Sequence, residues 1–144
     1  MSLNCYTDAS AEKVGDKFRA SVACVIVVNG TKTILFAGGR PIGNFSSNLA
    51  EMIAICYALE EVSTICKALD LTPGELRVCS DNQSVVDLCS GFSETDSNKM
   101  LRLLGEVEKS ESKFDSVSYQ WVRGHASNKY NELADHIAYT VLKG

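Results

Sequence analysis

The sequence predicts an α/β fold built on a five-stranded mixed sheet with helices on both faces. Three observations support this class. Apolar runs of strand length recur in the first 40 residues, a long segment from residue 47 has helical periodicity, and strand-like and helical runs alternate after it. The resulting order, β-β-β-α-β-α-α-β-α, predicts a sheet whose first strands are antiparallel.

Three strands and the breaks between them are expected in the N-terminal part. Asn29-Gly30 joins the second and third strands, because this dipeptide favours a tight hairpin turn. Residues 11–18 are polar and are expected to form a loop, whereas Gly38-Gly39 and Pro41 should end the third strand. The predicted strands cover residues 3–8, 19–28 and 33–37.

A long amphipathic helix is expected over residues 47–69, because apolar residues recur there at spacings of three and four. Ser46, Ser47 or Asn48 could cap its start, and Thr72-Pro73-Gly74 ends the segment. The remaining predicted elements are a strand at 76–80, helices at 81–89 and 97–110, a strand at 117–122 and a helix at 128–142.

Length and composition indicate one domain over residues 1–144. The chain is 45% hydrophobic and has two prolines, which argues against disorder. No window approaches the ~20 apolar residues that span a membrane, and no long apolar stripe suggests self-association, so we expect a monomer without membrane contact.

The formal charge of −4 implies that any nucleic acid is bound weakly, through a local patch or through divalent cations.

The six cysteines indicate a reducing, cytoplasmic compartment. They fall in apolar runs, where a free thiol behaves as a small hydrophobic group, and no Cys-x-x-Cys pair or secretory signal is present. The pattern argues against a disulfide framework and against a zinc site. Cys79 is expected in the core, because no histidine lies near it in the sequence.

Four acidic residues occupy positions where a sheet and its helices could bring them together. Asp8 is expected at the end of the first strand and Asp81 just past the fourth, so they meet if these strands are neighbours. Glu51 lies one turn into the long helix, and Asp135 lies in the last helix. Because close carboxylates disfavour one another's ionisation, such a cluster requires cations. Oxygen ligands without thiolates suit Mg²⁺ or Mn²⁺.

The acidic cluster and a nearby histidine suggest phosphodiester hydrolysis. Two ions about 4 Å apart could activate a water, hold the scissile phosphate and stabilise the leaving oxygen. His125, on the loop before the last helix, could relay a proton or help release the product.

Each of these residues also has a purely structural interpretation. Asp8 could form a turn, Asp81 could cap the following helix, and Glu51 could favour the helix dipole from the first turn. Asp135 could lie on an exposed helix face, and His125 could be an ordinary loop histidine. The joint occurrence of all five in one ordered pattern favours the catalytic interpretation.

Five short segments of the chain form an ordered pattern. They are Tyr6-Thr7-Asp8-Ala9-Ser10, Ser47-Asn48-Leu49-Ala50-Glu51, Ser80-Asp81-Asn82-Gln83-Ser84-Val85, Trp121-Val122-Arg123-Gly124-His125 and Asn131-Glu132-Leu133-Ala134-Asp135. In these segments and their order the chain resembles type 1 ribonuclease H over essentially its whole length. The resemblance implies the ribonuclease H-like fold and Mg²⁺-dependent cleavage of the RNA strand of RNA–DNA hybrids, which leaves 5′-phosphate and 3′-hydroxyl ends. It also implies metal ligation by Asp8, Glu51, Asp81 and Asp135, and a mobile-loop role for His125.

The resemblance also implies how substrate is contacted, and the departures from it suggest weak binding. Ala9 replaces the usual glycine, and residues 11–18 lack the family's glycine-rich character. Residues 90–98 contain no Lys or Arg, and only Lys99 and Arg102 follow where many relatives carry a basic helix. The polar residues expected to touch the hybrid are Ser10, Ser47, Asn48, Asn82 and Gln83.

The sequence leaves two rival functions open. The first is a related DNA nuclease of the same superfamily, resembling a resolvase or a transposase core. The second is a catalytically silent nucleic-acid-binding module that keeps the fold. The intact acids argue against the silent module, because it has no use for carboxylates that repel one another.

Overall fold

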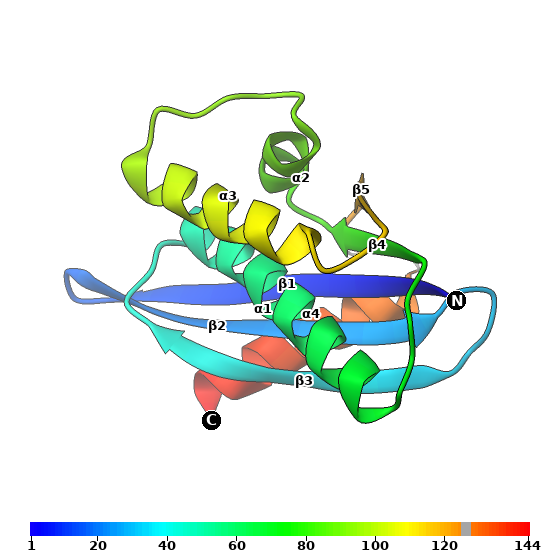
Figure 1. Ribbon diagram of the computed structural model, residues 1–144. Helices are drawn as coiled ribbons and strands as arrows, with labels where there is room; N and C mark the ends of the chain where they lie inside the picture. Colours follow the sequence, from blue (N-terminus) through cyan, green and yellow to red (C-terminus); the bar gives the residue numbers. More distant parts are fainter. Residues whose placement is uncertain (125–127) are drawn as a thin grey trace.

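The computed structural model describes residues 1–124 and 128–144 (Figure 1). Its elements follow the order that the sequence predicts. The strands are β1 (Ser2–Val14), β2 (Lys17–Val28), β3 (Ile34–Gly43), β4 (Glu75–Ser80) and β5 (Ser116–Trp121). The helices are α1 (Ser47–Ala68), α2 (Gln83–Ser90), α3 (Asn98–Glu111) and α4 (Lys129–Lys143).

The five strands form one mixed sheet in the order β3-β2-β1-β4-β5. The strands β1, β2 and β3 are antiparallel neighbours, whereas β4 lies parallel to β1 and β5 lies parallel to β4. The sequence-based prediction of a five-stranded mixed sheet is therefore confirmed, and so is the neighbourhood of the first and fourth strands. This neighbourhood positions the candidate site.

Helices cover both faces of the sheet (Figure 1). On one face α1 packs on β1 and β2, and α2 and α3 pack beside α1 over a core that includes Leu3, Cys5 and Val85. On the other face α4 packs against a smaller cluster that includes Tyr6 and Ala134. Alternate residues of β1 thus supply both layers, as the two-residue period of a strand requires.

The hairpin between β1 and β2 corrects the prediction of a loop over residues 11–18. Both strands continue into this segment, and only Gly15 and Asp16 form the turn, with Gly15 at a φ of 68° that glycine adopts readily. Glu12 lies opposite Arg19 and forms ion pairs with Arg19 and with Lys143 of α4. The hairpin therefore continues through residues that lack the alternating apolar pattern by which strands are recognised in a sequence, and polar side chains pair across it.

The third strand also runs further than predicted, because Gly38, Gly39 and Pro41 do not end it. A Cβ at Gly39 would lie 2.4 Å from the backbone oxygen of Val22, so only glycine fits between β2 and α4 here. Pro41 is tolerated because β3 is an edge strand. The connection from β2 turns at Asn29 and Gly30, as expected, but it extends to Thr33.

In the part of the chain that the structure describes, none of the helices combines the length and apolar content that crossing a bilayer requires.

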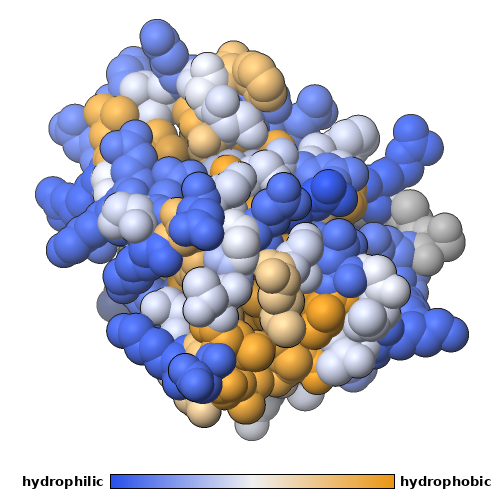
Figure 2. Space-filling view, turned by 45° about the vertical axis from the view of Figure 1, so that its right-hand side comes forward, coloured by the Kyte–Doolittle hydropathy of each residue, from blue (hydrophilic) through white to orange (hydrophobic). Residues whose placement is uncertain are grey.

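Figure 2 shows a face that is largely hydrophilic, with apolar side chains gathered in its lower part. The largest apolar side chains that are fully buried include Leu3, Met52 and Leu59 between the sheet and α1. The core thus lies between the layers.

Candidate active site

The position of Asp8 and Asp81 follows from the pairing of β1 with β4. The two strands pair in parallel from Ser2 and Glu75 to Thr7 and Ser80, where β4 ends. Asp8 is the next residue along β1 and Asp81 the next along the chain after β4. Both carboxylates therefore lie at the carboxyl end of β4. The prediction that Asp8 ends its own strand is wrong, because β1 continues to Val14.

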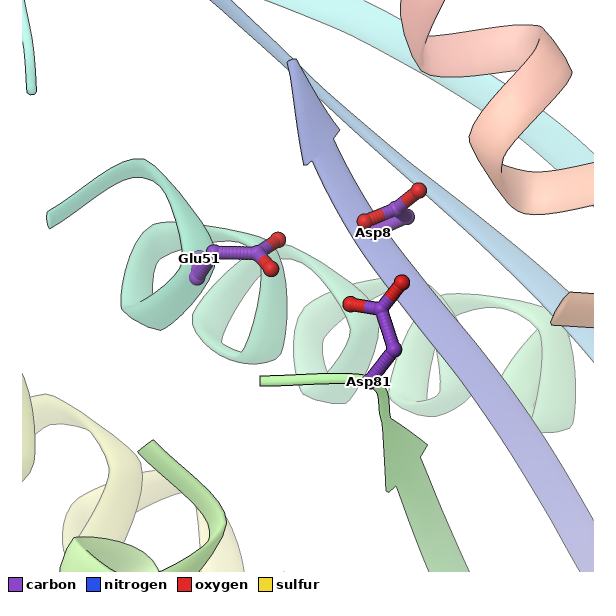
Figure 3. Close-up of side chains that lie close together, drawn as sticks. All are labelled: Asp8, Glu51 and Asp81. Atoms are coloured by element: carbon purple, nitrogen blue, oxygen red, sulfur yellow. The ribbon is translucent and has the colours of Figure 1, made fainter. Parts of the chain in front are cut away.

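Glu51 joins these two residues from α1, one turn after the helix begins at Ser47. Each of Asp8, Glu51 and Asp81 offers a carboxylate oxygen, and these oxygens all lie within 4.8 Å of one another. Figure 3 shows the three side chains turned toward a common space from β1, α1 and the segment after β4. Three separate elements thus converge on one acidic cluster.

The surroundings of Asp8 and Glu51 disfavour the ionised forms of their carboxyl groups. Burial is the largest cause that raises the pKa of Asp8, followed by the charges of Glu51 and Asp81. Burial, then the charge of Asp81, likewise raises the pKa of Glu51. The backbone of Ala9 lowers both pKa values through hydrogen bonds without reversing either shift. At neutral pH the free cluster therefore holds protons that ordinary carboxyl groups would release.

The donor set fits a hard divalent cation. Among the described residues, the Oδ2 atom of Asp8 and the Oε1 atom of Glu51 are buried and lack a hydrogen-bond partner. Buried polar atoms of this kind are costly unless another group satisfies them. Both belong to a cluster that contains only carboxylate oxygens, which is the ligand chemistry of Mg²⁺ and Mn²⁺. The cluster is consistent with divalent metal binding.

The fourth predicted ligand, Asp135, lies beside the cluster. It is exposed on α4, and a side-chain hydrogen bond with it contributes to raising the pKa of Asp8. Within residues 1–124 and 128–144, the group whose ligand atoms all lie within 4.8 Å does not include Asp135. The predicted role of His125 lies outside the described residues.

Three of the structural interpretations do not hold. Asp8 does not form a turn, because it lies within β1 and is only 3% exposed. Asp81 does not cap α2, because Asn82 is the N-cap and accepts a hydrogen bond from the backbone N–H of Val85. Glu51 lies beyond the first turn of α1, which contains no acidic residue.

The predicted substrate-binding residues gather at the starts of α1 and α2. The side-chain amide of Asn82 donates a hydrogen bond to Oδ1 of Asn48 over 3.4 Å, which links the two helix starts. Ser47 and Gln83 are exposed beside them, whereas Ser10 is half-buried on β1. Asn48 lies one helical turn before Glu51, so this polar group borders the acidic cluster.

Two features near the cluster were not predicted from the sequence. A groove of about 460 Å³ adjoins the start of α1, and its lining includes Asn48, Ser84 and Ser97. The indole N–H of Trp121 donates a hydrogen bond to the backbone oxygen of Asp81 over 3.1 Å. The Trp121 segment matched the family pattern, but its contact depends on the register of β4 and β5, which the sequence does not specify.

Comparisons with known proteins agree with this geometry. The chain is 32% identical to a ribonuclease H of Ehrlichia ruminantium over 120 residues, which are 81% of this chain and 78% of that protein. The solved structure of RNase H1 from the archaeon Halobacterium salinarum superposes with a TM-score of 0.84 at 24% identity, over 99% of this chain and 98% of that chain.

A second solved structure, LC11-RNase H1 in complex with an RNA/DNA hybrid, has a TM-score of 0.80 at 18% identity, over 97% of this chain and 99% of that chain. At these identities the structural likenesses establish the fold. The family model described as RNase H matches residues 1–143. The chain therefore belongs to the ribonuclease H family.

Proposed function

We propose that the protein hydrolyses the RNA strand of RNA–DNA hybrids and leaves 5′-phosphate and 3′-hydroxyl ends. The observation that carries the proposal is the cluster of Asp8, Glu51 and Asp81 at the carboxyl end of β4, in a chain of the ribonuclease H family. The solved complex of LC11-RNase H1 with a hybrid supports this substrate class.

The proposed cofactor is Mg²⁺, as two ions, with Mn²⁺ as a substitute. Asp8, Glu51 and Asp81 would hold the metal, with Asp135 as a further ligand from α4. The bound ions would supply activation of a water and stabilisation of charge on the scissile phosphate and leaving oxygen. The buried oxygens of Asp8 and Glu51 that lack partners support the role of these two residues as ligands.

The protein's own side chains would bind and orient the hybrid. Asn48 and Asn82, together with Ser47 and Gln83 at the same helix starts, offer exposed or half-buried polar groups next to the acids. Such groups can distinguish 2′-hydroxyls on one strand from the backbone shape of the other, largely independently of base sequence. His125 would relay a proton or help release the product, and Ser10 would contact substrate from β1.

Two further expectations belong to this proposal. Residues 1–144 would act as a single ribonuclease H domain, which the match of the family model to residues 1–143 supports. The compartment would be reducing and cytoplasmic, because all six cysteines are free thiols and four of them are buried. Burial raises the pKa of Cys79 to about 11, which keeps this thiol protonated and supports a core role.

The test is cleavage of a labelled RNA–DNA hybrid in Mg²⁺, with EDTA, duplex RNA and duplex DNA as controls. We expect cleavage of only the RNA strand of the hybrid, and its loss in EDTA. Asp81→Asn should abolish cleavage without unfolding the protein, because it removes one charged ligand of the cluster. Asp115→Asn, an exposed change outside the cluster, should leave the rate unchanged.

Other outcomes would replace the proposal with one of its rivals. Cleavage of duplex DNA in preference to the hybrid would indicate a DNA nuclease. Hybrid binding without cleavage in Mg²⁺ and in Mn²⁺ would indicate a silent binding module. Undiminished activity of Asp81→Asn would overturn the metal-ligand role of Asp81.

A further inference from the structure

Asp81 belongs to neither the strand before it nor the helix after it, so other contacts must fix its position. Ser80 ends β4, and α2 begins only at Gln83. A carboxylate on such a connecting segment can serve as a metal ligand only if the backbone beneath it is held in place. Residues 121–124 supply two hydrogen bonds to the backbone of Ser80 and Asp81 and one close backbone approach to the Asp81 side chain.

This segment contacts Asp81 and its neighbour at successive points. The backbone N–H of Val122 donates a hydrogen bond to the oxygen of Ser80 over 2.9 Å and so extends the pairing of β4 with β5 by one residue. The indole N–H of Trp121 then donates to the backbone oxygen of Asp81 over 3.1 Å. The two bonds fix the carbonyl groups of two consecutive residues, Ser80 and Asp81.

Gly124 completes the contact at the side chain of Asp81. A Cβ on Gly124 would lie 3.2 Å from Oδ2 of Asp81 and 3.5 Å from its Cβ. The absence of a side chain therefore lets the backbone of residue 124 lie against the carboxylate. An alanine there would require Asp81 to retreat by a few tenths of an ångström.

We propose that Trp121 and Gly124 are positioning residues, which hold Asp81 where it serves as a metal ligand. The inference rests on the proposed metal site, and it adds two residues that act on the metal through Asp81. Trp121 fixes the main chain of Asp81 through a hydrogen bond from its indole N–H. The backbone of Gly124 limits how far the carboxylate of Asp81 can move toward residue 124. Their removal should therefore weaken metal binding rather than the fold.

The test uses Trp121→Phe, which keeps an aromatic ring but removes the donor, and Gly124→Ala. Tyr139→Phe and Gly105→Ala are the matched controls, because Tyr139 is an exposed ring on α4 and a Cβ at Gly105 meets nothing within 4 Å. Mn²⁺ binding without substrate is measured by calorimetry. Trp121 is the only tryptophan, so quenching of its emission by Mn²⁺ gives a second readout in the wild type and in Gly124→Ala.

We expect the Mn²⁺ dissociation constant to rise about fivefold in Trp121→Phe, the change that the loss of one neutral hydrogen bond corresponds to. It should rise at least as much in Gly124→Ala. Cleavage by Trp121→Phe should recover at high metal concentration, and the Tm in EDTA should fall by no more than the loss of one neutral hydrogen bond explains. The two control variants should bind metal as the wild type does.

Unchanged Mn²⁺ affinity in both variants would overturn the inference, and so would a fall of the Tm in EDTA with metal affinity intact, which would show a structural role only. If the wild type binds Mn²⁺ but cleaves no hybrid, the proposed function fails, and the metal titrations alone then decide the inference. If the wild type binds no metal, there is no ligand for Trp121 and Gly124 to position, and the inference fails.

Discussion

Two of the clustered carboxyl groups, those of Asp8 and Glu51, are buried in surroundings that favour their neutral forms. Burial and the neighbouring acids raise the pKa values of both groups in the folded protein. In the unfolded chain these groups would ionise at their ordinary values near 4. The metal-free fold therefore gains nothing from this cluster at neutral pH, and a bound divalent cation would offset the repulsion.

The shifts predict an inverse dependence of stability on pH for the metal-free protein. Because the folded pKa values of Asp8 and Glu51 are raised, the folded state binds more protons than the unfolded state above about pH 4–5. The free energy of unfolding should therefore fall as pH rises from 5 to 8 in EDTA. Thermal unfolding over this range measures the effect. Saturating Mg²⁺ should reverse the trend, since ligands must be deprotonated to bind metal.

Glu12 does not obscure this measurement. Its pKa is lowered by hydrogen bonds with Lys143 and Arg19, so its contribution is present above its ordinary value and is lost only at more acidic pH. The double variant Asp8→Asn with Glu51→Gln should lose most of the slope, whereas exposed changes such as Glu108→Gln with Asp115→Asn should keep it. A metal-free Tm that rises toward pH 8 would contradict the role assigned to the buried pair.

At the scale of elements, the sequence predicts the order of strands and helices but misjudges the extent of two strands. Residues 11–14 carry no apolar period, yet they pair with residues 17–20 of β2. Glu12 also forms ion pairs with Arg19 and with Lys143, which is 131 residues away. In β3, Gly38-Gly39 and Pro41 suggest a break, because glycine and proline ordinarily interrupt strands. Both errors concern contacts between elements, which local patterns do not contain.

The same distinction applies to the site. The proximity of Asp8 and Asp81 could be predicted, because their positions are set by β1 and β4, and these two strands are parallel neighbours. The contact of Trp121 with Asp81 could not, because it requires the register that pairs Ser80 with Trp121. The sequence motifs thus identify the acidic residues of the site, whereas the contact that Trp121 makes with Asp81 is seen only in the packed sheet.

The close approach at Gly39 predicts a large effect from one methyl group. Gly39→Ala would place a Cβ 2.4 Å from the oxygen of Val22 and 3.2 Å from Ile137, so β2, β3 and α4 must shift. Overpacking of this kind costs about 1–3 kcal/mol, to be measured by denaturant unfolding. Gly105→Ala, in α3 with open space around it, should instead stabilise by roughly 0.5–1 kcal/mol. Equal stability of the two variants would contradict the packing described for β3.

At the scale of the whole molecule, an acidic protein must engage a polyanion. The chain has 18 acidic and 14 basic residues, and residues 90–98 lack Lys and Arg. Lys99 and Arg102 of α3 line a cavity of about 310 Å³ together with the apolar side chains of Phe45, Leu49 and Leu103. These two cations adjoin the start of α1, whose polar residues border the acidic cluster. They are the cations that we expect to contact substrate phosphates.

Weak electrostatic engagement predicts a shallow salt dependence. Each neutralised phosphate contributes about 0.9 to the slope of log affinity against log salt in duplex DNA, so contacts through Lys99 and Arg102 should give a slope near −2. The KM for the hybrid, measured across salt concentrations, tests this under conditions in which it reports affinity. Lys99→Gln with Arg102→Gln should remove most of the slope, whereas Lys113→Gln, near the C-terminal end of α1, should not change it. A steep slope that survives in the double variant would place the substrate on a different basic surface, because counterion release counts phosphate contacts wherever they lie.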